Sequence, residues 1–417
     1  MEAVDQESEP PAAQPRSLVR IPGRKGATGQ KSEPAAQAAQ GARREGGSWT
    51  RQNSRAPQSR SISRRSFIAT ATAAAATAAA SAATAAAALA GCSGADVIDA
   101  VTGKTGDKAA DKPVAGSTFA FDTYCTFTVY GDDAAPAKLA QACARFDGLF
   151  DLYKDTSDIA RINAAGGEAT QVDADTVDVI TRAIEFAEKT DGLFDITIGA
   201  VSTLWDFDKH VRPADDVIAA ALPHVSWRNV RVEADAKTVQ LTDPESKLDL
   251  GGIAKGYVAD RLCDLLRAET KATAAVISLG GNIAYFGAKP DGGTWDTGIR
   301  DPNDPGGSKT VGTAHVKGGS LVTSGLYERT FEQDGITYWH ILDPRTGMPV
   351  QTDVVSDTIY CPSSTEADAL STALFVAGTR RGAEIVDGFD GTAAYFIKQD
   401  GSTVESSRWQ ELTDFNA

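Results

Sequence analysis

The sequence predicts an α+β fold, and three observations lead to that class. Residues 119–131, FAFDTYCTFTVYG, alternate and are rich in aromatic and β-branched side chains, which is typical of a strand. Residues 136–152 place Leu139, Cys143, Phe146 and Phe150 along one face, which is the spacing of a helix. Further helices and strands follow without strict β-α-β alternation, so we expect one mixed catalytic domain over 118–417.

The remaining elements follow in order along the chain. Expected helices cover 174–190, 254–268 and the segment from Pro362 to Gly378, and expected strands cover 229–233, 238–242, 274–281, 312–318, 336–343 and 393–399. The last helix has the clearest signals, because Ser363 and Glu366 form a capping box and Gly378 suits a C-terminal stop. The sequence contains no internal repeat.

The N-terminal part differs in composition from the rest. Residues 1–60 are rich in Pro, Gln, Ser, Gly and Arg and nearly lack large apolar side chains, which predicts a disordered basic segment. Export signals rarely lie so far from an N-terminus. One hypothesis is therefore that translation starts downstream of Met1 at a non-Met codon, because the only other methionine is Met348.

Residues 61–92 read as an export signal. The segment 63–68, SRRSFI, fits a twin-arginine signal, and the Ala/Thr run after it is too poor in Leu, Ile and Val for a permanent membrane span. The run ends in LAGC, which resembles a lipobox, so we expect a lipid on Cys92 that holds the chain at the outer face of the cytoplasmic membrane. Residues 93–117 would form a polar tether. The alternative is a low-complexity tail with chance arginines.

Charge and cysteine content exclude two classes. The formal net charge is −15 although the first 65 residues are basic, so the main domain lacks the basic surface of a nucleic-acid binder. Four cysteines beyond Cys92 are widely scattered, which makes a zinc site improbable and favours isolated buried thiols. They are Cys125, Cys143, Cys263 and Cys361.

A glycine-rich stretch, LDLGGIAKGYVAD at 248–260, joins an apolar strand to a helix. Glycines at such a junction let the backbone approach a ligand closely, and Lys255 beside them indicates an anionic ligand. The stretch lacks both common nucleotide-binding patterns, GxxxxGK[ST] and GxGxxG. The alternative is an ordinary strand-to-helix turn with an exposed lysine.

Two other stretches carry residue types suited to catalysis. Asp368 and Thr372 lie four residues apart near the start of the last expected helix, and their hard oxygens suit Mg²⁺. His340 ends a strand before the turn that begins at Asp343, so it fits a general base with a pKa near working pH. The alternatives are a capped helix with incidental polar residues and a structural histidine.

Eight stretches in order resemble the ApbE (Ftp) family of FAD:protein FMN transferases. They are DTYCTFTVYG, LYKDTSDIARIN, GLFDITIGAVSTLWDF, LDLGGIAKGYVAD, ISLGGNIAYFG, TSGLYERTF, HILDPRTGMPV and DALSTALFVAG, and they span nearly all of residues 118–400. The resemblance implies a single T-fold-like catalytic domain. It also implies FAD as the substrate and Mg²⁺ as the cofactor.

The resemblance assigns roles to positions of this sequence. It implies a Mg²⁺ site made by the carbonyl of Gly252 with Asp368 and Thr372. It also implies contacts with FAD from Phe121, Tyr153, Leu193, Phe194, Asp195, Asp249, Lys255 and Ile341, with Tyr153 stacking on the flavin ring. The chain departs from the family where Ser371 replaces a second Asp of some members, where Phe121 replaces a common Met, and where Ala200 replaces Pro.

The implied reaction transfers FMN from FAD to a threonine hydroxyl of a partner and releases AMP. We expect His340 to take the hydroxyl proton, oriented by the Asp343 turn, and Lys255 to balance phosphate charge. The chain lacks the family's acceptor motif, so the acceptor should be another exported or membrane-associated flavoprotein. Three alternatives stay open, namely a Mg²⁺-dependent FAD pyrophosphatase giving FMN and AMP, a surface lipoprotein that only binds FAD, and a structural or adhesive lipoprotein.

Overall fold

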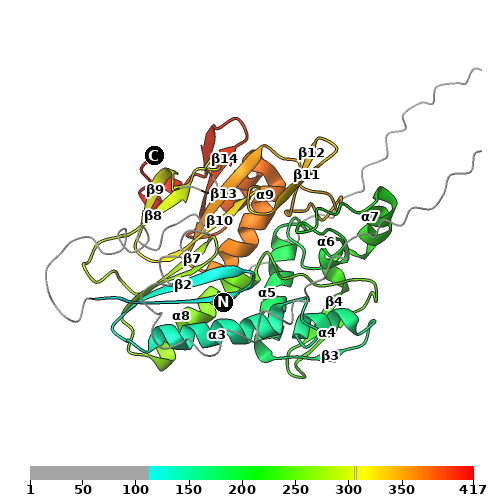
Figure 1. Ribbon diagram of the computed structural model, residues 1–417, viewed down its shortest axis with the longest axis horizontal. Helices are drawn as coiled ribbons and strands as arrows, with labels where there is room; N and C mark the ends of the chain where they lie inside the picture. Colours follow the sequence, from blue (N-terminus) through cyan, green and yellow to red (C-terminus); the bar gives the residue numbers. More distant parts are fainter. Residues whose placement is uncertain (1–111, 305, 307) are drawn as a thin grey trace, which may run out of the picture. The chain divides into compact units, whose positions relative to one another are not determined.

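The computed structural model describes residues 112–304, 306 and 308–417, which are coloured in Figure 1. The expected disordered segment 1–60, the export signal 61–92 with Cys92, and most of the tether lie outside these residues. Within the described part of the chain, no helix is long and apolar enough to cross a membrane.

The centre of the domain is an eight-stranded antiparallel sheet. Its strands, in spatial order, are β1 (Val114–Ala120), β2 (Thr123–Tyr130), β6 (Ala274–Leu279), β7 (Asn282–Phe286), β10 (Gly319–Gly325), β13 (Val354–Cys361), β14 (Ala393–Lys398) and β15 (Thr403–Glu405). Three small sheets are formed by β3 (Thr170–Gln171), β5 (Thr238–Leu241) and β4 (Val230–Glu233), by β8 (Trp295–Arg300) and β9 (Thr310–Val316), and by β11 (Thr330–Gln333) and β12 (Ile336–Trp339). The predicted α+β class is confirmed.

Four long helices accompany the sheet. They are α3 (Ala135–Phe150), α5 (Ala174–Lys189), α8 (Ala254–Glu269) and α9 (Ser364–Val386), and each lies within a few residues of a predicted helix except at the end of α9. Helix α9 packs against β10 and β13 and beside α8, as Figure 1 shows. Shorter helices are α4 (Asp158–Ala164), α6 (Gly199–Ser202), α7 (Asp215–Ala221), α10 (Trp409–Thr413) and the 3₁₀ turns Leu222–His224 and Trp227–Asn229.

The predicted stop at Gly378 is confirmed for the first part of α9, because Gly378 has φ 77° and ψ 168° and leaves the helical conformation. The sequence analysis did not predict the second helical segment, which follows at once and ends at Val386. Asp353 holds the kink, because its carboxylate accepts the Thr379 amide at 3.1 Å and the Thr379 hydroxyl at 2.6 Å. The glycine therefore supplies a left-handed residue inside the element, and a side chain from outside the helix satisfies the backbone there.

The segment 119–131 is a hairpin and not one strand. Strand β1 begins at Val114, four residues before the predicted domain start and inside the predicted tether. The turn residues Phe121 and Asp122 have φ 54° and 56°, which is unfavourable for residues other than glycine. Two contacts stabilise this tip, since the Phe121 amide donates to Asp147 at 2.7 Å and Asp122 pairs with Arg329 at 3.1 Å.

The core lies between the sheet and the helices and includes most of the cysteines. Cys125, Cys143 and Cys361 are buried, Cys263 is partly buried, and all four are free thiols. The predicted free thiols are confirmed, and the thiols of Cys125 and Cys143 lie near enough to shift each other's pKa, lowering that of Cys125 and raising that of Cys143. Burial raises the pKa of Cys263 and that of Cys361 to about 12, so both stay protonated.

Candidate active site

The site begins where α8 crosses α9 at Gly256. A Cβ at this position would lie 2.6 Å from the Cβ of Asp368 and would overlap the carbonyl oxygen of Ser364, so only glycine allows the helices to approach this closely. The Gly256 amide donates to Asp368 Oδ2 at 2.8 Å. The carboxylate of Asp368, 4% exposed, is thereby held at the N-terminal end of α8, where the helix dipole favours negative charge.

Gly252 and Thr372 meet at the same place. A Cβ on Gly252 would lie 2.8 Å from Thr372 Oγ1 and 3.1 Å from the ring of Phe194. In a continuous helix the Gly256 amide would bond to the carbonyl of Gly252. Because that amide donates to Asp368, the Gly252 carbonyl is left available. The structure thus brings together the three residues that the sequence assigned to a metal.

The donor set at this point fits a hard cation. Gly252, Asp368 and Thr372 offer a carbonyl, a carboxylate and a hydroxyl oxygen, which are ligand types that Mg²⁺ accepts while keeping several waters. Among residues 112–304, 306 and 308–417, no group of three or more His, Cys, Asp or Glu side chains is placed to hold a metal ion. Asp368 is the carboxylate in this donor set.

Asp249 shapes the glycine-rich loop through both of its carboxylate oxygens. Its Oδ1 accepts the Gly251 amide at 2.8 Å, and its Oδ2 accepts the Ser202 hydroxyl at 2.7 Å. Lys255, the second residue of α8, donates from Nζ to the Gly251 carbonyl at 3.2 Å. The ammonium group thus lies at the loop itself, in position to balance the charge of an anion that approaches it.

His340 directly follows β12, and its amide donates to the carbonyl of Arg329 at 3.2 Å. Water reaches the ring, yet the surrounding protein removes much of its hydration. This desolvation, followed by the positive charges of Arg329 and Lys255, lowers the pKa of His340 to about 4. The imidazole is therefore neutral near pH 7, but the expected pKa near working pH is wrong, because the lost hydration and the two cations make this ring a weaker base than an ordinary histidine.

The Asp343 carboxylate binds Arg345 and not His340. It accepts Arg345 Nε at 2.9 Å, Nη2 at 2.7 Å and the Arg345 amide at 2.9 Å. Asp343 thus stabilises the turn after His340, and our expectation that it helps orient the histidine holds only through that turn. The carbonyl of Ile341 accepts the Val350 amide at 2.9 Å, and the expected backbone contact from Ile341 to FAD stays a prediction.

Aromatic residues from two loops lie near the same charges. Tyr153 is 75% exposed, and its ring face is open for stacking. Loss of hydration, with the negative charge of Asp249, raises the pKa of Tyr153, while Arg329 opposes the rise, which places Tyr153 among these groups. Phe121, half-buried at the tip of the β1–β2 hairpin, is tied to the same region by the ion pair of its neighbour Asp122 with Arg329.

The stretch Leu193–Phe194–Asp195 is buried. Phe194 packs beside Gly252, which places this stretch against the glycine-rich loop. The Asp195 carboxylate accepts the amide and hydroxyl of Thr197 at 2.8 and 2.6 Å and the Trp227 amide at 2.8 Å. Its side chain therefore has a structural role in holding two loops together.

Sequence reasoning missed two charged residues of this region. Arg329 stands in TSGLYERTF, a stretch left ambiguous, and no spacing signal could have placed it beside His340. Asp357 in β13 is buried beneath α9 with both carboxylate oxygens lacking hydrogen-bond partners. Its only signal in the sequence is an acidic residue inside a strand otherwise rich in β-branched residues.

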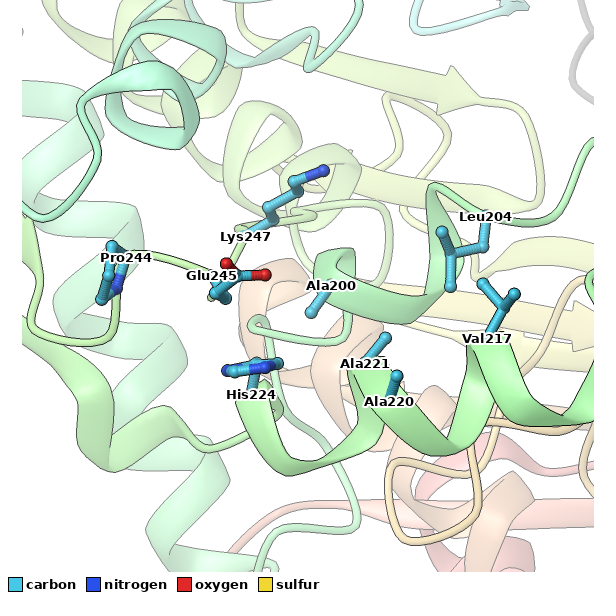
Figure 2. A pocket seen from close by; sticks show the side chains of 9 residues that line it. All are labelled: Ala200, Leu204, Val217, Ala220, Ala221, His224, Pro244, Glu245 and Lys247. Atoms are coloured by element: carbon cyan, nitrogen blue, oxygen red, sulfur yellow. The ribbon is translucent and has the colours of Figure 1, made fainter.

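A pocket lies beside α6 and α7. Its volume is about 350 Å³, and it is lined by Ala200, Leu204, Val217, Ala220, Ala221, His224, Pro244, Glu245 and Lys247. Figure 2 shows these side chains around the hollow beside α6 and α7. Apart from Ala200, where the sequence departs from the family, the pocket contains no residue singled out by the sequence. The candidate site is accordingly defined by the convergence of Gly252, Asp368 and Thr372.

Proteins with similar sequences identify the chain as an enzyme, a transferase. The FAD:protein FMN transferase of Treponema pallidum is 37% identical over 324 residues, which cover 72% of this chain and 88% of that protein. A Klebsiella pneumoniae protein with the same name is 32% identical over 279 residues, covering 66% of this chain and 86% of the relative.

The ApbE family profile matches residues 121–396, so the chain belongs to the ApbE family. The crystal structure of the ApbE protein from Thermotoga maritima is 32% identical with a TM-score of 0.66, covering 72% of this chain and 99% of that one. The apo flavinyl transferase ApbE of Pseudomonas stutzeri is 25% identical with a TM-score of 0.66, covering 75% and 100%. The predicted family and its fold are confirmed.

Proposed function

We propose that the protein transfers FMN from FAD to a threonine hydroxyl of an exported flavoprotein. The hydroxyl oxygen attacks the phosphorus of the FMN moiety, the bond from that phosphorus to the bridging oxygen breaks, and AMP leaves. Two close approaches carry the proposal, that of Gly252 to Thr372 and that of Gly256 to Asp368. They bring the Gly252 carbonyl, the Asp368 carboxylate and the Thr372 hydroxyl together near Lys255, and these three oxygen donors are called the cradle below. The named activity of the relatives supports the proposal.

The residues present fit Mg²⁺, because the cradle offers only oxygen donors and a glycine whose carbonyl is available. Gly252, Asp368 and Thr372 would hold the ion. Bound there, it would supply neutralisation of negative charge on phosphate oxygens.

The chain's own groups then have distinct tasks. His340, neutral near pH 7, takes the proton from the attacking hydroxyl, and the nearby Lys255 and Arg329 offset the negative charge of the pyrophosphate. Tyr153 stacks on the flavin ring, and Asp249 keeps the glycine-rich loop in shape through Gly251 and Ser202. Most of the catalysis arises from positioning and electrostatics.

We further propose that a lipid on Cys92 holds the mature chain on the outer face of the cytoplasmic membrane. The support is the order of three sequence signals, namely the twin-arginine motif, the weakly apolar run and LAGC. This placement would let the enzyme meet acceptors after export.

The test of the reaction uses the purified full chain with FAD, Mg²⁺ and an exported flavoprotein as acceptor. We expect the acceptor to gain the mass of FMN minus water, and Asp368→Ala or chelation of the metal to prevent the gain. Free FMN and AMP with an unmodified acceptor would instead make the protein a pyrophosphatase. Intact FAD after incubation with several acceptors would exclude catalysis.

A further inference from the structure

Asp357 is the most unusual buried acid among the described residues. It lies in the middle of β13, is 1% exposed, and neither carboxylate oxygen has a hydrogen-bond partner. Burial raises the pKa of Asp357 well above its ordinary value, and the backbone amides of Ser324 and of Asp357 itself, which oppose this rise, do not have the geometry of a hydrogen bond to the carboxyl group. Ionising an acid without partners in this place costs several kcal/mol, so its presence requires a reason.

The register of the sheet fixes the direction of the Asp357 side chain. Asp357 pairs with Ser324 of β10 on one side and with Phe396 of β14 on the other. The Ser324 hydroxyl contacts the Ser371 hydroxyl of α9 at 3.0 Å, and the Phe396 ring lies 3.0 Å from a Cβ placed on Gly382 of α9. Directly paired residues in antiparallel strands point to the same face, so Asp357 points toward α9.

Two hydroxyl groups connect this place to the cradle. Ser371 donates to the carbonyl of Asp368 at 2.9 Å, and since its single proton is used there, Ser324 is the donor in the contact between the two serines. These two hydrogen bonds link Ser324 of β10, which is paired with Asp357, to Ser371 and then to the turn of α9 that carries Asp368 and Thr372. Asp357 therefore faces the stretch of helix that presents the oxygen ligands.

We propose that Asp357 supplies the second negative charge for a divalent cation held by Gly252, Asp368 and Thr372, acting from the sheet side without contacting the ion. This inference rests on the proposed function. A divalent cation at the cradle meets one carboxylate directly, so the site keeps an excess of positive charge that a second acid would balance. In the protein interior such a charge acts more strongly than in water, and the cation in turn offsets the cost of burying the carboxylate.

The rival explanation is an acid that merely fills space in the core. The two explanations differ in what happens on removal of the charge. A space-filling acid can be replaced without change in cation binding. A charge-balancing acid leaves the cation bound more weakly, because groups outside the direct ligands tune metal affinity by about ten- to a hundredfold.

The test measures Mn²⁺ binding by electron paramagnetic resonance with the purified full chain, without FAD. We expect Asp357→Asn to weaken binding at least about tenfold. Thr358→Val is the matched control, because Thr358 is buried on the opposite face of the same strand, where its hydroxyl meets that of Thr323 at 2.9 Å. This control should bind Mn²⁺ like the unaltered protein.

Asp368→Ala separates this inference from the function on which it rests. Loss of Mn²⁺ binding in Asp368→Ala together with unchanged binding in Asp357→Asn would overturn the role of Asp357 and leave the cradle standing. Unchanged binding in Asp368→Ala would overturn the cradle itself, and with it the inference.

A second measurement does not depend on the binding assay. Asp357→Val replaces the unpaired carboxylate by an apolar side chain suited to a strand, so the melting temperature in EDTA should rise. The further gain in melting temperature on adding Mn²⁺ should be smaller than in the unaltered protein. An equal gain in both proteins would contradict the proposal.

Discussion

Gly252 and Thr372, 120 positions apart in the chain, are so close that a Cβ on the glycine would lie 2.8 Å from the threonine Oγ1. Such a separation is shorter than van der Waals contact between a carbon and an oxygen atom. The space between the glycine-rich loop and α9 therefore has room for the bare backbone only, which lets the loop's carbonyl and the helix's hydroxyl face one point.

Gly252→Ala should reduce FAD turnover at least about tenfold while the domain still folds. The added methyl group pushes the loop away from Thr372 and spoils a geometry in which displacements near 1 Å are costly. Turnover is measured by chromatography of FAD, FMN and AMP. The matched control is Gly148→Ala in α3, where a Cβ meets nothing within 4 Å. Equal turnover in both variants would contradict the role of Gly252.

Gly256→Ala should lower the free energy of unfolding of the domain. Its Cβ would lie 2.6 Å from Asp368 Cβ and overlap the Ser364 carbonyl, so α8 and α9 would have to separate. Overpacking of this kind costs about 1–3 kcal/mol. Urea denaturation followed by circular dichroism measures the free energy of unfolding, and an unchanged value would show that the helices move apart freely.

The lowered pKa of His340 predicts a pH effect on stability. The folded pKa is about 4, below the ordinary value of about 6.5 expected in the unfolded chain. The unfolded chain therefore binds more protons in this window. The contribution of His340 to stability is fully present above pH 6.5 and is lost as the pH falls toward 4. His340→Gln should make the free energy of unfolding fall less steeply between pH 6.5 and 4.

The positive charge of Arg329 should cause part of the lowering of the His340 pKa. After desolvation, the charge of Arg329 is the next largest cause of the lowered pKa of His340, and Lys255 follows. Arg329→Gln should raise the pKa of His340, as followed by NMR titration of the imidazole signal that is absent from His340→Gln. Lys289→Gln is the control, since Lys289 pairs with Asp291 and Asp296 and is not among the causes of the His340 shift. The account fails if Arg329→Gln leaves this pKa where it was.

Membrane attachment should depend on Cys92. Without a thiol at this position no thioether-linked lipid can form, so Cys92→Ala should move the protein from the membrane fraction to the soluble fraction of the exporting cell. Immunoblots of the two fractions make the measurement, and Cys263→Ala serves as a control for loss of a thiol elsewhere. Retention of Cys92→Ala in the membrane fraction would contradict the lipid anchor.

The sequence predicted the helices better than the sheet. The helices α3, α5 and α8 have apolar residues at helical spacing, and this signal is local. The central strands β10 and β13 were missed because both faces are covered and both carry polar residues such as Ser324 and Asp357. The stop at Gly378 was predicted, but the helical segment after it was missed because Asp353, which accepts the Thr379 amide at its start, lies outside the helix.

The site was predictable only in part, for a related reason. The capping residue Ser363 and the spacing of Asp368 and Thr372 are local features, whereas the approach of Gly252 to Thr372 depends on packing between α8 and α9. The roles of these residues came from the family resemblance. The expected pairing of Asp343 with His340 did not anticipate Arg345, which binds the same carboxylate from two positions away.

The measurement that tests the central claim most directly is the ratio of AMP released to FMN bound covalently on the acceptor. The full chain, FAD, Mg²⁺ and an exported flavoprotein are incubated, and tandem mass spectrometry locates the modified residue. The account predicts one AMP for each FMN on a threonine, and neither product with His340→Gln or with an acceptor whose target threonine is replaced by valine. AMP formed with free FMN and no modified threonine would contradict it.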